Sequence, residues 1–590
     1  MPVRVMCFLA SAAAVSSFKA PSSVPGRPVS LRFSASMKAA GTDSTWQPLA
    51  VLETTAKNSS GPGGCGYFSH LNNWTASWAS FELGADGKEV EVLVQRASSP
   101  ITKAVVRPDS ASARVVSIDS TGVRIAVSAS ARFHLAVDGG LDETNTGPDY
   151  TGPPMHTMAI FAEPHDPSPP SKGQPGVVWI EPGDAIPDAS ALPANTSVLA
   201  FAPGVHRVTP NSDGYQVYTL TDKVRLHLSL GAVLHAALQD DPEAGWATQT
   251  LHVSGYGVLS GEENEREAHT DSRHLSRSTP HAGCGDNGSP QGVTIKGAKS
   301  VILEGILLVD HPNHHIIAGA NGKCVDGAPA GVATNLKILG WRANGDGLHV
   351  FGSWKVSDLF MRTQDDSMYT DMSSQAPKDG CPAPTFDRLT VWNDANGASF
   401  IVSGYGSSLR DSDVLYSRAS YAWWSGGRVF SQRRMGTVTN LIVSDVRVHD
   451  PLPSFNTFQI DESDGPPGLV EERDGGDNAG RSFHNVTFIN ITVANLSTTR
   501  TCTKFGAGCN CRPACSAGPL PAGMPNLLLG GTDKSQSNNI SDLRFVNVTI
   551  AGMGLHELPT HAAGWLNVSG MVVNVTLDGK PLYKSEGRIL

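Results

Sequence analysis

The chain has 590 residues, a formal net charge of −10, and a composition of 40% hydrophobic and 17% charged residues. The acidic surplus argues against a nucleic-acid partner, because phosphate binding requires a basic surface. No apolar run approaches the roughly 20 residues that span a bilayer, so no membrane partner is expected. The 61 glycines and 39 prolines, without helical periodicity, favour a turn-rich β protein.

Residues 1–20 have the features of a signal peptide. Arg4 precedes an apolar stretch from Val5 to Val15, and small residues follow. A buried or irregular terminus is the alternative. Seven of the eleven Asn-x-Ser/Thr sequons fall within residues 485–574, which suggests a glycosylated surface. We therefore expect a secreted, extracellular protein.

A Pro-rich stretch at residues 166–175 divides the chain into two unequal parts. Before it, short alternating segments such as 89–94 and 123–127 predict antiparallel strands, which fits a β-sandwich over residues 45–165. After it, residues 176–590 carry one recurring apolar pattern. The predicted organisation is a signal peptide, a sandwich, a linker and a long repetitive domain.

The recurring pattern is Φ-x-Φ-x-x-Φ-x-Φ, where Φ is apolar. It starts at Val301, Leu336, Trp354, Leu441, Val486 and Leu543. Each half alternates with a period of two, as a strand with one buried face does, and the extra residue between the halves marks a bend. Repeated bends wind a chain into a solenoid of parallel strands. The fold class we predict is all-β, a right-handed parallel β-helix preceded by the sandwich.

Two acidic motifs follow consecutive repeats. The starts at Leu336 and Trp354 differ by 18 residues, which is plausible for one coil. Asp346 lies three residues past the end of the first repeat, and Gln364, followed by Asp365 and Asp366, lies three past the end of the second. Adjacent parallel strands are about 4.8 Å apart, so the three carboxylates should converge.

Three crowded carboxylates suit glycoside hydrolysis. Mutual repulsion raises at least one pKa, and the reaction needs one protonated acid and one ionised carboxylate that activates water. The alternative is that these motifs only form turns that cap backbone amides. Either motif alone favours turns, but their spacing of one coil favours catalysis by Asp346, Asp365 and Asp366.

The order NGDG at 344–347 and QDDS at 364–367 resembles motifs of pectin-lyase-like β-helix hydrolases. Glycoside hydrolase family 49, the dextranases and isopullulanases, fits better than family 28, the polygalacturonases, since its members have an N-terminal sandwich. The resemblance implies an inverting hydrolase of α-glucans without a cofactor. It also implies that Asp365 is the general acid, with Asp346 and Asp366 deprotonating the water.

The chain departs from both families. Where polygalacturonases have Gly-His-Gly and Arg-Ile-Lys motifs, the nearest counterparts are Asn396-Gly397 and Arg428-Val429-Phe430. An acidic pectin substrate is therefore less expected than a neutral glucan. However, Ser367-Met-Tyr369 stands where the dextranase group tends to have a lysine, so substrate specificity does not transfer. A family 28-like hydrolase and a carbohydrate-binding β-helix without turnover remain the alternatives.

Further candidates surround this acidic centre. Tyr421, Trp424 and Arg428 could stack on and hydrogen-bond a sugar, although one tryptophan of this segment could equally be interior packing. Asn344 and His349 flank Asp346 and could contact substrate, while His349 could instead be a satisfied wall histidine. Trp341 is expected in the core.

No metal site is expected. His311, His314 and His315 lack an acidic partner at ligand-like spacing, and the acidic segments 461–465 and 474–477 lack the ligand order of an EF-hand loop. The cysteines at 502, 509, 511 and 515 predict disulfides in an oxidising compartment, with zinc as the cytosolic rival. We expect a monomer whose partner is its polysaccharide substrate.

Overall fold

The computed structural model describes residues 18–56, 74–138, 156–241, 249–264, 290–320, 324, 327–342, 345–370, 380–393, 398–401, 405–416, 427–432, 438–449, 455–461, 482–494, 527–530, 539–550, 552–554, 566–569 and 572–581. These residues are all-β apart from one 3-10 turn, η3 (Ala189–Ala191). Within them no helix has the length and apolarity to cross a bilayer.

The N-terminal unit is a sandwich of two sheets. The first contains β1 (Phe18–Lys19), β4 (Leu52–Thr55), β5 (Thr75–Leu83), β7 (Ala104–Arg107), β10 (Ala131–Val137) and β11 (His156–Glu163). The second contains β2 (Phe33–Ala39), β3 (Gln47–Leu49), β6 (Val90–Arg96), β8 (Ala113–Asp119) and β9 (Gly122–Val127). Apolar side chains from both sheets form one buried core between them. All pairings are antiparallel except that of β5 with β11.

The sandwich begins earlier than the sequence predicted. Phe18 of β1 pairs with Leu83 of β5, and β2 precedes residue 45. The unit therefore includes the end of the segment expected as a signal peptide, of which residues 1–17 lie outside the described residues. β2 alternates apolar and polar residues throughout, so the period-two signal of a strand is present before residue 45 as well.

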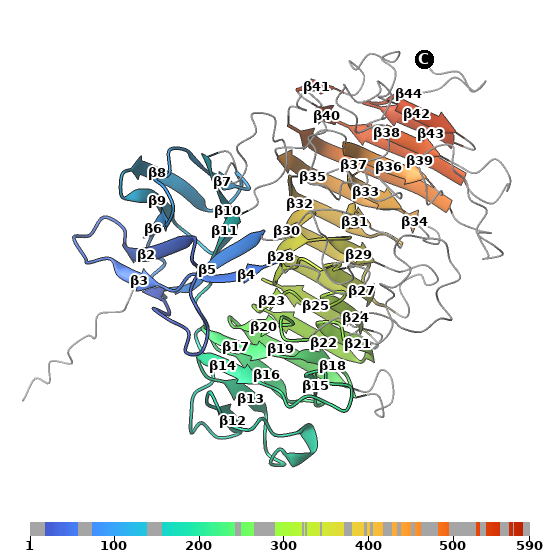
Figure 1. Ribbon diagram of the computed structural model, residues 1–590. Coiled ribbons are helices and arrows are strands. Elements are labelled where there is room, and N and C mark those ends of the chain that lie inside the picture. The colour runs from blue at the N-terminus through green and yellow to red at the C-terminus, as the bar shows by residue number, and fades with distance from the viewer. Residues whose placement is uncertain are drawn as a thin grey trace, which may run out of the picture.

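The second unit is a parallel β-helix that climbs from β12 to the C-terminal strands, with the sandwich beside its middle coils (Figure 1). Its largest sheet contains β12 (Val177–Ile180), β13 (Val198–Phe201), β14 (Gly204–Arg207), β16 (Arg225–Leu228), β17 (Ala232–His235), β19 (Thr250–Gly255), β20 (Val258–Ser260), β22 (Ser300–Glu304), β23 (Leu307–Val309), β25 (Gly331–Thr334), β26 (Lys337–Leu339), β28 (Trp354–Thr363), β30 (Thr385–Asn393), β32 (Ser408–Leu415), β34 (Val438–Thr439), β35 (Ile442–His449), β37 (Ser482–Val493), β39 (Asn539–Val546), β40 (Thr549–Ile550), β41 (Met553–Gly554), β43 (Val572–Leu577) and β44 (Lys580–Pro581).

The largest sheet contains two parallel ladders, one through β13, β16, β19, β22 and β25 and one through β14, β17, β20, β23 and β26, and a third parallel ladder closes the coils. It contains β15 (Val217–Thr219), β18 (Ala237–Gln239), β21 (Val293–Ala298), β24 (Ile316–Ala320), β27 (Leu348–Gly352), β29 (Met368–Thr370), β31 (Ala398–Ile401), β33 (Gly427–Gln432), β36 (Phe455–Asp461), β38 (Leu527–Gly530) and β42 (Leu566–Ser569). The apolar residues of the repeats fill the interior between the ladders. The predicted all-β fold, with a parallel β-helix, is confirmed.

The extra residue of the apolar repeat is a bend in the left-handed backbone region. One residue of positive φ recurs at this point in successive coils: Gly305, Asn335, Asp358, Arg388, Asp411, Asp445, Asn490 and Asn547. Most are Asn, Asp or Gly, the residues for which this conformation costs least. Side chains also bridge coils here, since Asn490 Nδ2 donates to Asp445 Oδ1 at 2.9 Å and Asn547 Nδ2 donates to Asn490 Oδ1 at 2.9 Å. The bends predicted from the repeat therefore lie above one another in successive coils, and we call this row of positive-φ residues the bend column.

The sandwich and the β-helix share a buried apolar interface. Trp78 and Phe161 of the sandwich belong to one cluster with Trp341, Phe360 and Trp392 of the helix, with other side chains of both units. Trp341 is buried as expected, yet it lies in this interface and not inside the helix, because the interior pattern of its coil ends at residue 338. The two units are therefore held together by apolar burial, the main driving force of association.

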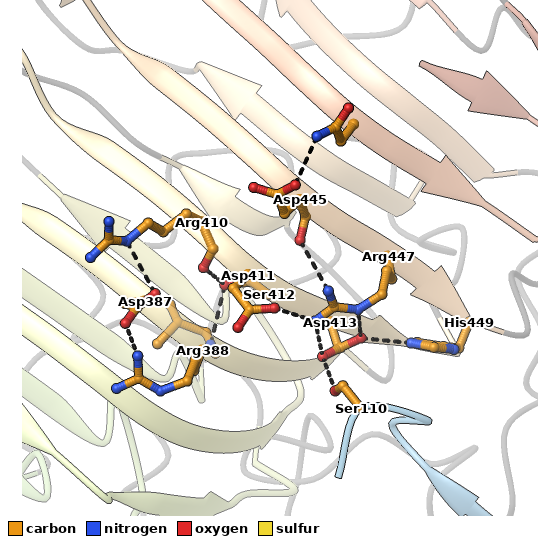
Figure 2. Close-up of polar contacts among 12 residues, drawn as sticks. Ser110, Asp387, Arg388, Arg410, Asp411, Ser412, Asp413, Asp445, Arg447 and His449 are labelled. Carbon is orange, nitrogen blue, oxygen red and sulfur yellow. Dashed lines mark hydrogen bonds and ion pairs between the residues drawn. The ribbon is translucent and has the colours of Figure 1, made fainter. Parts of the chain in front are cut away.

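Ion pairs complete the same interface. Lys337 Nζ lies 2.6 Å from Glu163 Oε1, and both side chains are 1% exposed. On later coils of the β-helix, Ser110 of the sandwich donates to Asp413, which also pairs with Arg447 and His449 at 2.7 Å each (Figure 2). These pairs tie β32 and β35 to the sandwich. Together with the Lys337–Glu163 pair they hold the sandwich in place on the coils.

A disulfide joins Cys324, between β24 and β25, to Cys381, just before β30. It links loops of coils that are not neighbours in sequence. The cysteines at 502, 509, 511 and 515, which the sequence analysis expected to form disulfides, lie outside the described residues.

Candidate active site

The acidic motifs lie at one corner of the β-helix, where the chain turns from the largest sheet into the third ladder. We call this place the acidic corner and define it as residues 310–315, 345–347 and 364–367, on three successive coils. The segments connect β23 to β24, β26 to β27 and β28 to β29.

The register predicted for two of these coils is wrong. Ile338 pairs with Met361, a step of 23 residues, and Trp354 pairs with Gly331, not with Leu336. The repeat of this coil begins at Gly331, and Leu336 starts its second half. The first half is hard to recognise in the sequence, because its interior residues, Gly331 and Ala333, are small. On the third ladder Leu348 pairs with Met368, a step of only 20 residues. The corner before β27 is therefore longer than the corner before β29.

The two acidic motifs are nevertheless adjacent at the backbone, because the ladder continues through the corner. The His315 amide donates to the Asp346 carbonyl at 2.9 Å, and the Gly347 amide donates to the Asp366 carbonyl at 2.8 Å. Parallel pairing of this kind places His314, Asp346 and Asp366 at equivalent positions on successive coils, about 4.8 Å apart at the backbone. Asp346 and Asp366 therefore follow one another on adjacent coils through the register of the third ladder, and their catalytic grouping stays a prediction.

The doublet is fixed by a tight four-residue corner. Asp365 Oδ1 accepts a hydrogen bond from the Asp366 amide at 3.0 Å, and the Asp365 carbonyl accepts from Thr363 Oγ1 at 2.8 Å. Thr363 Oγ1 also lies 2.8 Å from Ser367 Oγ, and Asn393 Nδ2 donates to the Asp365 carbonyl. Asp365 is 9% exposed and Asp366 is half-buried. Both carboxylates therefore start from a backbone with little freedom.

Asp346 is held by two histidines. Its Oδ2 lies 2.9 Å from His349 Nε2 and 3.7 Å from His314 Nδ1, while the side chain is nearly buried at 5% exposure. Burial alone would raise the pKa of Asp346, but His314 and then His349 outweigh it, and the net pKa is lowered. Asp346 is therefore not the carboxyl whose pKa repulsion raises. It stays ionised.

The histidines beneath the corner have separate roles. His315 Nδ1 lies 2.8 Å from the Asp346 carbonyl, and burial lowers the pKa of His315 to about 4. Burial also lowers the pKa of His311 well below its usual value. Both rings are fully buried and neutral, so they act as scaffolding for the turn that carries Asp346.

Sequence reasoning missed His314. It was dismissed for lack of an acidic partner, yet its ring reaches Asp346 from the preceding coil and lies against His349, with ring centroids 4.6 Å apart. The only sequence signal was the register of β24 with β27, which short strands conceal. His314, Asp346 and His349 also form the one group of potential metal ligands found within the described ranges, with ligand atoms within 4.8 Å of one another.

The structure describes only some of the other residues predicted for the site. His349 contacts Asp346, as above, and its ring packs on Tyr369 at 4.5 Å. Arg428 lies on β33, two coils beyond β29 in the same ladder, and only its backbone is described. Asn344, Tyr421 and Trp424 lie outside the described residues.

The chain is similar in sequence to known dextranases. Dextranases of Arthrobacter sp. (strain CB-8) and Arthrobacter globiformis are 24% and 25% identical over 375 and 377 residues. Each match covers 57% of this chain but only 55% of the relative. No family model matches the chain.

The fold comparison covers almost the whole chain. Dex49A from Penicillium minioluteum superposes with a TM-score of 0.62 at 16% identity, over 95% of this chain and 96% of that one. The sequence match supplies the likeness to dextranases, and the structural match supplies the shared architecture of the two units. The chain is therefore similar in sequence to dextranases, over about half of their length, and it shares its two-unit parallel β-helix architecture with Dex49A.

Proposed function

We propose that the chain hydrolyses α-glycosidic bonds of a neutral glucan such as dextran, by an inverting acid/base mechanism at the acidic corner. The observation that carries this proposal is the equivalent position of Asp346 and Asp366 on adjacent coils, beside Asp365. The dextranase relatives support the reaction class and the substrate. Inversion needs two carboxyl groups that leave room for a water molecule between them.

The surroundings suggest how the roles divide. Asp346 has a lowered pKa, so it suits the ionised carboxylate that orients or deprotonates water. Its Oδ1 is buried and has no hydrogen-bond partner among the described residues, which leaves an acceptor for that water. Asp366, one coil above, assists it. Asp365, tied through its own Oδ1 to the Asp366 amide, takes the remaining role of general acid.

The charges at the corner favour a neutral substrate. Asp346, Asp365 and Asp366 lie on two adjacent coils at this corner, and the ionisable groups that pair with Asp346 are the histidines His314 and His349. A uronate would bring a further negative charge against this group and would be repelled. Extracellular action is part of the proposal, and the Cys324–Cys381 disulfide supports it, because disulfides persist in oxidising compartments.

The test is release of reducing ends from dextran, pullulan and polygalacturonate, with the anomer of the first product followed by NMR. We expect activity on an α-glucan and inversion at the anomeric carbon. Activity confined to polygalacturonate would favour the family 28-like alternative. Glycan binding without any product would favour the carbohydrate-binding β-helix.

Asp365→Asn gives the test of mechanism. Loss of the acid should lower turnover by about 10²–10⁴-fold, with the melting temperature unchanged. Asp86→Asn, at an exposed turn of the sandwich, is the matched control and should keep full activity. A collapse of stability in Asp365→Asn with catalysis per folded molecule retained would show that the doublet serves only the turn.

A further inference from the structure

We propose that His314, Asp346 and His349 form a binding site for one divalent transition-metal ion, and that the bound ion blocks hydrolysis. The site itself follows from geometry. The blocking effect rests on the proposed function, because it assumes that Asp346 must bind the attacking water.

The donor set matches the chemistry of such ions. Two imidazoles and one carboxylate are the protein ligands of many zinc sites that keep an open position. Imidazole nitrogen favours zinc, nickel and copper, whereas magnesium and calcium prefer sites built from oxygen alone. The cluster therefore points to a first-row transition metal.

The distances are those that one ion requires. Ligand atoms about 2.1 Å from a zinc ion lie about 3.4 Å apart in a tetrahedral shell. Asp346 Oδ2 lies 2.9 Å from His349 Nε2 and 3.7 Å from His314 Nδ1, values on either side of this separation. All three ligand atoms lie within 4.8 Å of one another.

The ligands are also held in place by their surroundings. His315 Nδ1 and the His315 amide both contact the Asp346 carbonyl, and Tyr369 packs on the ring of His349. His349 pairs in register with Ile317 below and with Tyr369 above, so its Cα is fixed by two ladder neighbours. Such supporting contacts orient metal ligands and raise affinity.

A second observation points to an absent ligand. Asp346 Oδ1 is buried without a hydrogen-bond partner within the described part of the chain, and such an acceptor is costly unless something occupies it. The carboxylates of Asp365 and Asp366 add negative potential on the next coil. A cation at this corner would satisfy the carboxylate, and it would displace the water that catalysis needs.

The experiment titrates metal-free protein, made without a histidine tag, with Zn²⁺, Ni²⁺, Mg²⁺ and Ca²⁺ by calorimetry. We expect one equivalent of Zn²⁺ or Ni²⁺ to bind at this site, with no comparable uptake of Mg²⁺ or Ca²⁺. His314→Gln and His349→Gln should each weaken that equivalent by about 100-fold or more. His252→Gln, at the separate His252–Glu304 pair, is the matched control and should keep it.

Each outcome decides one part of the proposal. Equal Zn²⁺ uptake by the wild type and both cluster variants would overturn the site. His314→Gln alters a half-buried side chain, so it remains informative if His349→Gln does not fold. Binding that saturates without slowing dextran hydrolysis would overturn the blocking effect. Binding by a wild type that hydrolyses no glucan would defeat the proposed function and leave the metal site standing.

Discussion

Asp346 and Asp366 occupy equivalent positions on neighbouring coils, since the Gly347 amide donates to the Asp366 carbonyl at 2.8 Å. The corners that carry them differ in length, and the third ladder brings them back into step at Leu348 and Met368. The acidic centre therefore depends on strands that pair after the corner. Substitutions of the acidic side chains should therefore affect activity without changing the stability of the coils.

Asp346→Asn should lower hydrolysis by about 10²–10⁴-fold, because an amide cannot accept the proton of the attacking water. The carbonyl that His315 contacts is unchanged, so the fold should persist. Initial rates on dextran and a melting curve measure both effects. Wild-type rates in this variant would remove Asp346 from the mechanism.

Lys337→Met should destabilise the protein by about 3–5 kcal/mol. The substitution leaves Glu163 buried without its cation, although Asn335 still donates to it. Adding Glu163→Gln in the same chain should recover much of the loss, because the uncompensated charge disappears. Melting temperatures of the wild type, the single variant and the double variant provide the comparison. Equal melting of the two variants would mean that the pair is not coupled.

Acid should destabilise the interface through His134. Burial among Trp392 and Tyr416 lowers the pKa of His134 to about 3. The unfolded chain takes up this proton near pH 6.5, whereas the folded chain does so only near pH 3. Stability from this group is therefore complete above pH 6.5 and falls between pH 6.5 and 3, by about 1–3 kcal/mol near pH 4.

The measurement is the melting temperature at pH 7 and pH 4.5 for the wild type and for His134→Phe. The phenylalanine preserves the aromatic packing and cannot take up a proton, so the difference between the two pH values should shrink. Part of the pH dependence of the melting temperature should remain in the variant, because other buried histidines, among them His311 and His315, also have lowered pKa values. An unchanged difference would show that His134 does not contribute.

Asp445→Ala should cost about 1–2 kcal/mol, because residue 445 has a φ of 56° in the bend column, where a Cβ without a polar partner is strained. Asp445→Gly should cost less, although both variants lose the hydrogen bond from Asn490. Calorimetric melting of the full chain gives the order. Equal loss in both variants would assign the effect to the hydrogen bond alone.

Local sequence reasoning worked where one coil suffices to define the feature. The repeats at Val301, Trp354 and Val486 lie at the coil interior as predicted, and their extra residue is the bend. The error at Leu336 arose because Gly331 is too small to signal a buried position. Trp341 was assigned to the wrong core for a related reason, since apolarity does not say which unit a residue faces.

The sequence by itself determined the parallel β-helix and the sandwich before it, because side-chain alternation is a local property of the chain. The catalytic role that the acidic motifs suggest for the three aspartates stays a prediction. Tertiary structure alone decided that His314 reaches Asp346, and that the sandwich packs on the coils through Lys337 and Glu163. The physical reason is that register between coils is set by hydrogen bonds between strands far apart in sequence. One residue of slip in a corner changes which side chains meet, and the corner itself carries no periodic pattern.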